Sequence, residues 1–139
     1  MKARDIMTDR VECISPDASV FEAAGKMKLL DVGFIPVCDN DRLVGTITDR
    51  DIVVRGVAEK RDLDSMKVQD IMHKGVAYVF EEDSVDDVAR KMEEEEIRRV
   101  VVLSKDKRLT GVISLGDLSQ ARGKERLAGR ITREITEAA

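Results

Sequence analysis

The sequence repeats itself once, and this duplication limits the folds open to a chain of 139 residues. Matching residues recur at one offset through the first part of each copy, and at an offset larger by one after an insertion in the second copy. The matched pairs include Asp5-Ile6-Met7 with Asp70-Ile71-Met72, Ser19-Val20 with Ser84-Val85, Lys26-Met27 with Lys91-Met92, Gly45 with Gly111, and Asp51 with Asp117. A unit this short buries little core alone, so we expect the two copies to share one folded domain.

The periodic patterns run in the same order in both copies. A short apolar run opens each copy, at Val11–Ile14 and at Val76–Phe80, and capping residues follow it. Apolar residues then recur at helical spacing, from Val20 to Met27 and from Val85 to Met92. The runs that predict hairpins are Phe34–Cys38 with Leu43–Thr48, and Val100–Leu103 with Leu109–Ser114.

Asp51 and Asp117 follow the hairpins and are expected to open a second helix in each copy. The patterns therefore predict an α/β (α+β) fold built from two β-α-β-β-α repeats. We place the first repeat at residues 1–58, a charged linker at 59–67, the second repeat at 68–122 and a C-terminal helical tail at 123–139. Leu127, Ile131 and Ile135 share one face of the tail, which predicts that it packs on a partner or on the repeats.

Composition argues against several classes of protein. The net charge of −4 is unfavourable for a nucleic-acid-binding surface, which is usually basic. No apolar run approaches the roughly 18 residues that a membrane-spanning helix needs. Charged residues occur at once in Lys2, Arg4 and Asp5, so no signal peptide is expected and the predicted location is the cytoplasm.

The residues with reactive side chains are few. His73 is the only histidine, which excludes a histidine-based triad or a multi-histidine metal site within one chain, and no nucleophile–base pair is readable. We therefore expect neither an enzyme nor a metal protein. Cys13 and Cys38 fall in the predicted sheet of one repeat and would come within bonding distance if their strands are neighbours. Two buried thiols are the alternative, since the cytosol is reducing.

A Ser/Thr-x-x-Asp motif ends the last strand of each copy, as Thr48 with Asp51 and as Ser114 with Asp117. A carboxylate can accept two hydrogen bonds from the vicinal diol of a ribose. The hydroxyl group and the N–H groups of a helix N-terminus suit a phosphate oxygen. The alternative is that each aspartate simply caps its helix.

These motifs carry a resemblance to a known family. Gly45–Asp51, Gly111–Asp117 and Ile35-Pro36-Val37 resemble the pattern of the tandem CBS-domain pair, or Bateman module, over roughly residues 3–120. The second copy has Val100-Val101-Val102 without the usual proline. The resemblance implies two repeats packed with pseudo-twofold symmetry, in a non-catalytic regulatory module that binds an adenosine-type nucleotide such as AMP or ATP.

The same resemblance implies a homodimer that acts on a downstream protein of unknown identity. It requires no cofactor, although Asp49 and Asp51 would be able to hold Mg²⁺ through the phosphates of a nucleotide. An alternative is a structural or interaction module whose clefts stay empty, with a response to redox conditions through Cys13 and Cys38.

The resemblance also implies which residues line two nucleotide clefts between the repeats. The first cleft would be lined by Thr8, Val11, Val32, Gly33, Val112, Ser114 and Asp117. The second would be lined by Thr46, Thr48, Asp51, His73, Val76, Ile97 and Arg98, with Arg50 and Arg99 nearby. Guanidinium groups suit phosphate, so we expect the second cleft to bind a phosphorylated ligand. The alternative for these arginines is charge pairing with the glutamates of Glu93–Glu96.

Overall fold

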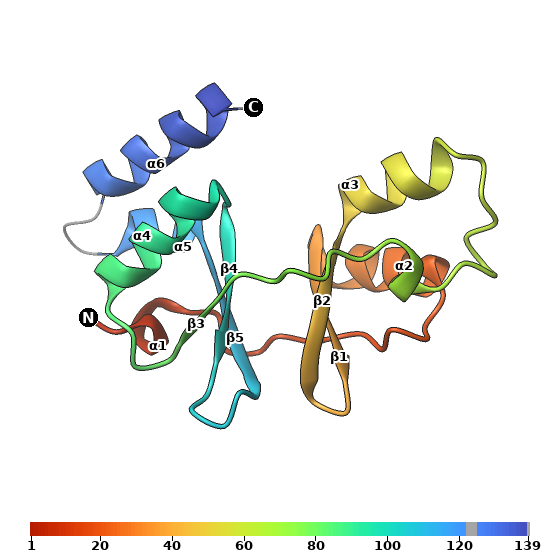
Figure 1. Ribbon diagram of the computed structural model, residues 1–139, viewed down its shortest axis with the longest axis horizontal. Helices are drawn as coiled ribbons and strands as arrows, with labels where there is room; N and C mark the ends of the chain where they lie inside the picture. Colours follow the sequence, from red (N-terminus) through yellow and green to blue (C-terminus); the bar gives the residue numbers. More distant parts are fainter. Residues whose placement is uncertain (122–124, 139) are drawn as a thin grey trace. The chain divides into compact units, whose positions relative to one another are not determined.

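The computed structural model describes residues 1–121 and 125–138, which form two compact units (Figure 1). One unit is Glu12–Val76, and the other combines Met1–Val11 with Ala77–Ala139. Each unit thus contains the body of one repeat together with the segment that opens the other repeat. We call residues 1–11 and 66–76 the opening segments.

The Glu12–Val76 unit is built around one helix and one hairpin. Its elements are α2 (Val20–Leu30), β1 (Phe34–Asp39), β2 (Arg42–Thr48), α3 (Asp49–Asp51), the π-helix η1 (Ile52–Val57) and the 3-10 helix η2 (Val68–Asp70). Val20, Ala23 and Met27 of the predicted helical stripe are buried, and they pack in one core with Ile35 and Ile47 of the hairpin. The helix and hairpin predicted for the first copy are confirmed.

The second unit repeats this plan and extends it. Its elements are α1 (Ala3–Ile6), β3 (Tyr78–Phe80), α4 (Val85–Glu95), β4 (Arg99–Leu103), β5 (Leu109–Ser114), α5 (Leu115–Gln120) and α6 (Glu125–Ala138). The strands form one sheet in the order β3-β4-β5. Val85, Val88, Ala89 and Met92 of α4 are buried in the core beside this sheet. The mixed α/β character is therefore confirmed, and the second copy shows the full predicted order β-α-β-β-α.

Helix α6 packs on α4 and α5 of its own unit. Ile131 and Ile135 of the predicted apolar face are buried in that unit's core. Of the two docking places predicted for the tail, the repeats are the one observed. The Leu127 side chain lies outside the described part of the structure.

The first strand of the first copy differs from the prediction. Val11–Ile14 was expected to form a strand, yet only Ile14 bridges β1, opposite Val37. In the second copy the Val101 N–H donates to Ala77 and helps to extend the parallel pairing of β3 with β4. Pro36 occupies the matching place in β1 and has no N–H to donate, so the first copy keeps a single bridge where the second has a strand.

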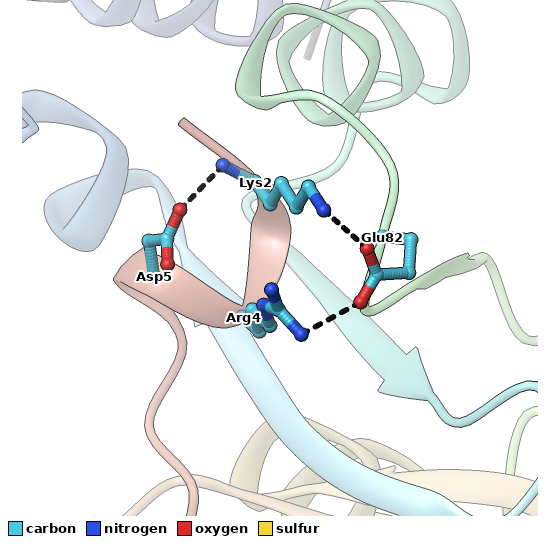
Figure 2. A network of polar contacts seen from close by, with 4 residues as sticks. All are labelled: Lys2, Arg4, Asp5 and Glu82. Carbon is cyan, nitrogen blue, oxygen red and sulfur yellow. Dashed lines mark hydrogen bonds and ion pairs between the residues drawn. The ribbon is translucent and has the colours of Figure 1, made fainter.

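The opening segments are held by matched turns. The Asp5 carboxylate accepts a hydrogen bond from the Lys2 N–H at 2.7 Å, and the Asp70 carboxylate accepts one from the Lys67 N–H at 2.9 Å. Figure 2 shows that Lys2 and Arg4 also both contact the Glu82 carboxylate. Hydrogen bonding from Lys2, and then the charges of Arg4 and Lys2, lower the pKa of Glu82.

The Asp-Ile-Met motif and the strand glycines belong to one packing arrangement. A Cβ atom on Gly45 would lie 2.7 Å from the His73 carbonyl oxygen and 2.7 Å from the Met72 sulfur. In the other unit, a Cβ atom on Gly111 would lie 2.8 Å from the Thr8 carbonyl oxygen and 2.6 Å from the Met7 sulfur. Only a residue without a side chain lets the opening segment lie this close to the strand.

We predict that Gly45→Ala destabilises the protein by about 1–3 kcal/mol, because the added methyl group overlaps a packed backbone and sulfur. Gly25→Ala is the matched control, since Gly25 lies in α2 with nothing within 4 Å of its added Cβ. That substitution should stabilise the protein by about 0.5–1 kcal/mol through helix propensity. Urea denaturation measures both free energies, and equal effects of the two substitutions would contradict this packing.

Glu82→Gln should reduce the loss of stability on acidification. Because the pKa of Glu82 is lower in the folded than in the unfolded protein, its pairing stabilises the fold above the unfolded-state pKa. That stabilisation disappears as the pH falls through the folded-state pKa. Melting temperatures between pH 7 and pH 3 measure this, with Glu94→Gln as a control for loss of an exposed charge. Identical pH profiles for both variants would refute the assignment.

Candidate functional site

The turn from β2 into α3 carries the motif residues of the first copy. Thr48 is the last residue of β2 and caps α3, its hydroxyl oxygen accepting a hydrogen bond from the Asp51 N–H at 3.1 Å. Asp51 returns the bond, since its Oδ2 accepts from the Thr48 N–H at 2.9 Å. Thr48 and Asp51 therefore form a reciprocal capping box at the start of the helix.

The turn from β5 into α5 has the same geometry. The Ser114 hydroxyl accepts from the Asp117 N–H at 3.0 Å, and Asp117 Oδ2 accepts from the Ser114 N–H at 2.9 Å. The expectation that each aspartate opens its helix is wrong in position, because the helices begin at Asp49 and Leu115. Each aspartate lies at the third helical position, where it can reach back to the capping residue.

The alternative that each aspartate caps its helix is thus observed. The cap engages only one of the two carboxylate oxygens of each aspartate. Oδ2 of both Asp51 and Asp117 is engaged in the box. Oδ1 is the atom left for other partners. A capping role and a ligand-binding role are compatible in one side chain, because a carboxylate has about four acceptor positions.

Each opening segment lies beside one of these turns. The His73 N–H donates to Thr46 and the Thr46 N–H to His73, both at 2.9 Å. Thr8 pairs with Val112 in the same way, at 2.9 and 3.1 Å. His73 and Thr8 therefore occupy matching places in the two units, next to the strand that leads into the motif.

The side chains at these two places differ in what they contact. His73 Nε2 lies 3.0 Å from Asp51 Oδ1, and the imidazole remains about half exposed. Asp51 is only 6% exposed, and no other charged residue is buried among those whose side chains are described. Both residues are predicted at one site from the sequence, but their contact is not. The alignment of His73 with Thr8 is the sequence signal for it.

The structure distributes the predicted site residues over the two units. The Glu12–Val76 unit contains Val32, Gly33, Thr46, Thr48, Arg50, Asp51, His73 and Val76. The other unit contains Thr8, Val11, Ile97, Arg98, Arg99, Val112, Ser114 and Asp117. Within each unit the opening segment, the strand and the Ser/Thr–Asp turn come together. Each predicted cleft also needs residues of the other unit, so the complete clefts stay a prediction.

The arginines were expected either at the phosphate or paired with the Glu93–Glu96 run. Arg50 and Arg98 are exposed. The pairs seen for the run join Glu93 to Arg130 at 2.8 Å and Glu95 to Lys91 at 3.8 Å. Among the described ion pairs, the cations that pair with the run are thus Arg130 and Lys91, and neither belongs to the predicted clefts.

The two cysteines are free thiols on neighbouring backbone. Ile14, which follows Cys13, accepts a hydrogen bond from the Cys38 N–H at 3.0 Å. Burial raises the pKa of the Cys38 thiol to about 12, helped by a side-chain hydrogen bond with Cys13 and by the charge of Asp41. The two side chains are in contact, and the disulfide between them stays a prediction.

Two searches of the described residues bear on other functions. Within residues 1–121 and 125–138, no three histidine, cysteine, aspartate or glutamate side chains are grouped so that they would hold a metal ion. Over the same residues, no helix combines the length and the apolar character needed to cross a membrane.

The family model of the CBS domain matches the chain twice, at residues 3–57 and 68–124. The chain therefore belongs to the CBS-domain family and contains two tandem domains. It is a CBS-domain regulatory module.

Two relatives show how far the similarity extends. The chain is 42% identical to the Bacillus subtilis protein YlbB over 138 residues, which cover 98% of this chain and 92% of the relative. It is 36% identical to hypoxic response protein 1 of Mycobacterium tuberculosis over 119 residues, which cover 85% of this chain and 82% of that one.

Two solved structures have the same fold. A crystal structure of hypoxic response protein 1 with two coordinated zinc ions matches with a TM-score of 0.79 at 35% identity, covering 87% of this chain and 98% of the other. The CBS-domain protein PAE2072 of Pyrobaculum aerophilum, solved as a complex with AMP, matches with a TM-score of 0.81 at 26% identity. The coverage there is 94% of this chain and 99% of the other.

Cys38 should resist alkylation in the native protein. A thiol with a pKa of about 12 contains almost no thiolate at pH 8, and the thiolate is the nucleophile. Mass spectrometry after iodoacetamide treatment should find Cys38 unmodified in native protein and modified after denaturation. Cys13→Ser should leave it protected, because burial is the larger cause. Rapid modification of native Cys38 would contradict this.

Proposed function

We propose that this protein is a non-catalytic sensor that binds an adenine nucleotide, such as AMP or ATP, at its Ser/Thr–Asp turns. The observation that carries the proposal is the duplicated turn. Both copies place a hydroxyl group and a carboxylate at the end of a strand, and both leave Oδ1 outside the capping box. The AMP complex of PAE2072, a protein of the same fold, supports this choice of ligand.

The residues fit the parts of such a ligand. An aspartate Oδ1 can accept hydrogen bonds from the vicinal hydroxyl groups of a ribose. The exposed guanidinium of Arg50 follows the Thr48 turn directly and would pair with phosphate. Asp49 Oδ1 accepts from the Arg50 N–H at 2.9 Å, so a magnesium ion at Asp49 would share that oxygen.

Complete clefts would draw on both units, as the sequence analysis expected. In that arrangement Arg98 would join Arg50 at the site of Asp51. The cleft of Asp117 would contain Gly33 at the matching place. This difference in charge favours the Asp51 cleft for the phosphorylated part of a ligand.

Regulation requires that the nucleotide bind one state of the protein better than another. We propose a homodimer as the form that a downstream protein recognises. Helices α2 and η1 pack together and leave Phe21, Val53 and Val57 more than half exposed. Exposed apolar side chains of this size are suited to an interface with a second copy. A cytoplasmic location and a role in stress, suggested by the likeness to hypoxic response protein 1, complete the proposal.

A redox-responsive module without nucleotide is the second candidate, and the contact between Cys13 and Cys38 favours it. Oxidation by a small disulfide would release two thiols of the oxidant and join Cys13 to Cys38, with transfer of two electrons and two protons. Quantifying free thiols in denatured protein isolated without reductant tests this. Two free thiols after exposure to oxidised glutathione would rule it out.

A thermal-shift experiment tests nucleotide binding. AMP, ADP or ATP at 100 times its dissociation constant should stabilise the native protein by about 2.7 kcal/mol. Asp51→Ala should remove most of this shift, and Asp117→Ala much less. Because both substitutions also break a capping box, each shift is measured from that variant's own melting temperature.

Asp70→Ala is the matched control, since it removes a carboxylate that closes a similar turn outside the motif. It should lower the melting temperature and keep the shift caused by nucleotide. The absence of a shift with any of the three nucleotides at millimolar concentration would refute nucleotide sensing. A larger effect of Asp117→Ala would reverse the choice of site.

A further inference from the structure

The two Ser/Thr–Asp turns have the same backbone but differ in the state of their carboxylates. Both oxygens of Asp51 are engaged, Oδ2 by the Thr48 N–H and Oδ1 by His73 Nε2. For Asp117, the described contacts include the Ser114 N–H at Oδ2 and nothing at Oδ1. Asp51 is buried, whereas Asp117 is only half-buried.

The cause of the difference is one side chain. His73 and Thr8 are held by the same pair of backbone hydrogen bonds to the strand beside the turn. The glycines next to this contact, Gly45 and Gly111, are equally crowded by the two opening segments. The imidazole of His73 contacts Asp51 Oδ1, and no described contact joins Thr8 to Asp117. The occupied oxygen therefore depends on the residue at position 73 and not on the backbone that both turns share.

We infer that His73 is an internal competitor for the oxygen of Asp51 that a ribose would use. This inference rests on the proposed function, because it concerns the same carboxylates. A ligand with a vicinal diol must displace the imidazole from Oδ1 at Asp51, and it meets no such competitor at Asp117. His73 is therefore a residue that sets the affinity and the ligand preference of one site alone.

The contact can be broken without unfolding the site. The His73 side chain is 54% exposed, so it can rotate into solvent and recover hydrogen bonds there. The capping bond from Thr48 to Oδ2 remains when Oδ1 is released. A ribose offers two hydroxyl donors to Asp51 Oδ1, and these replace the single contact with His73 Nε2 that the ligand displaces. A 2′,3′-dideoxy nucleotide offers none and leaves the buried carboxylate better satisfied by His73.

Calorimetric titration with AMP at fixed pH tests the competition. In an Asp117→Ala background only the Asp51 site reports, and His73→Thr gives that site the residue found at Thr8. AMP affinity should then rise about two- to tenfold, as expected for removal of one competing polar contact. In an Asp51→Ala background, Thr8→His should lower the affinity of the Asp117 site by a similar factor.

The single histidine allows a second readout in unmodified protein. The ring ¹⁵N signals of His73 should shift on addition of AMP toward the values seen in Asp51→Ala, because both remove the same contact. 2′,3′-Dideoxyadenosine monophosphate should leave them in place.

The outcomes distinguish failure of the competition from failure of the proposed function. Unchanged or weaker AMP binding by His73→Thr, or a His73 signal that AMP does not move while AMP binds at Asp51, would overturn the competition alone. Failure of AMP to bind the wild type and every variant would overturn the proposed function, and the competition with it.

Discussion

The close approach of an opening segment to a glycine in a strand is the contact on which the arrangement depends. The backbone at Met72 and His73 lies against β2 because Gly45 has no side chain there. The carboxylate of Asp70 closes the turn that delivers this segment. Without the glycine the segment would be pushed from the strand, and residue 73 would lose its place beside Asp51. The Asp-Ile-Met motif and the strand glycine are thus two halves of one interface.

The aspartates of the turns can combine a structural role with the proposed ligand binding in one side chain. A capping box fixes the carboxylate of Asp51 or Asp117 through Oδ2, so it needs little reorganisation when a ligand arrives. The cap orients Oδ1 and leaves it as the variable atom. Capping and binding are therefore not alternatives, as the sequence pattern alone had suggested.

Local patterns predicted most of the fold. The stripe from Val20 to Met27 and the two hairpins are visible in the sequence because each depends on neighbouring residues. The strand predicted at Val11–Ile14 does not form, because Pro36, distant in the sequence, lacks the N–H that would extend the pairing. The contact of His73 with Asp51 also escaped prediction, since the opening segment pairs with the other repeat's strand. The residue types of the motif indicated the candidate site. The pairing of His73 with Thr46, distant in the sequence, determines that Asp51 Oδ1 contacts the imidazole.

The duplicated plan explains why one substituted residue matters. Two identical turns would respond to a ligand at one concentration. With His73 at one turn and Thr8 at the other, the proposed ligand would meet two different carboxylates, because only Asp51 contacts an imidazole. At the Asp51 turn the proposed ligand would first have to displace the imidazole, and the pairing of its phosphate with Arg50 would offset that cost. Under the proposed function, divergence at one position would give the two matching turns different affinities for the same ligand.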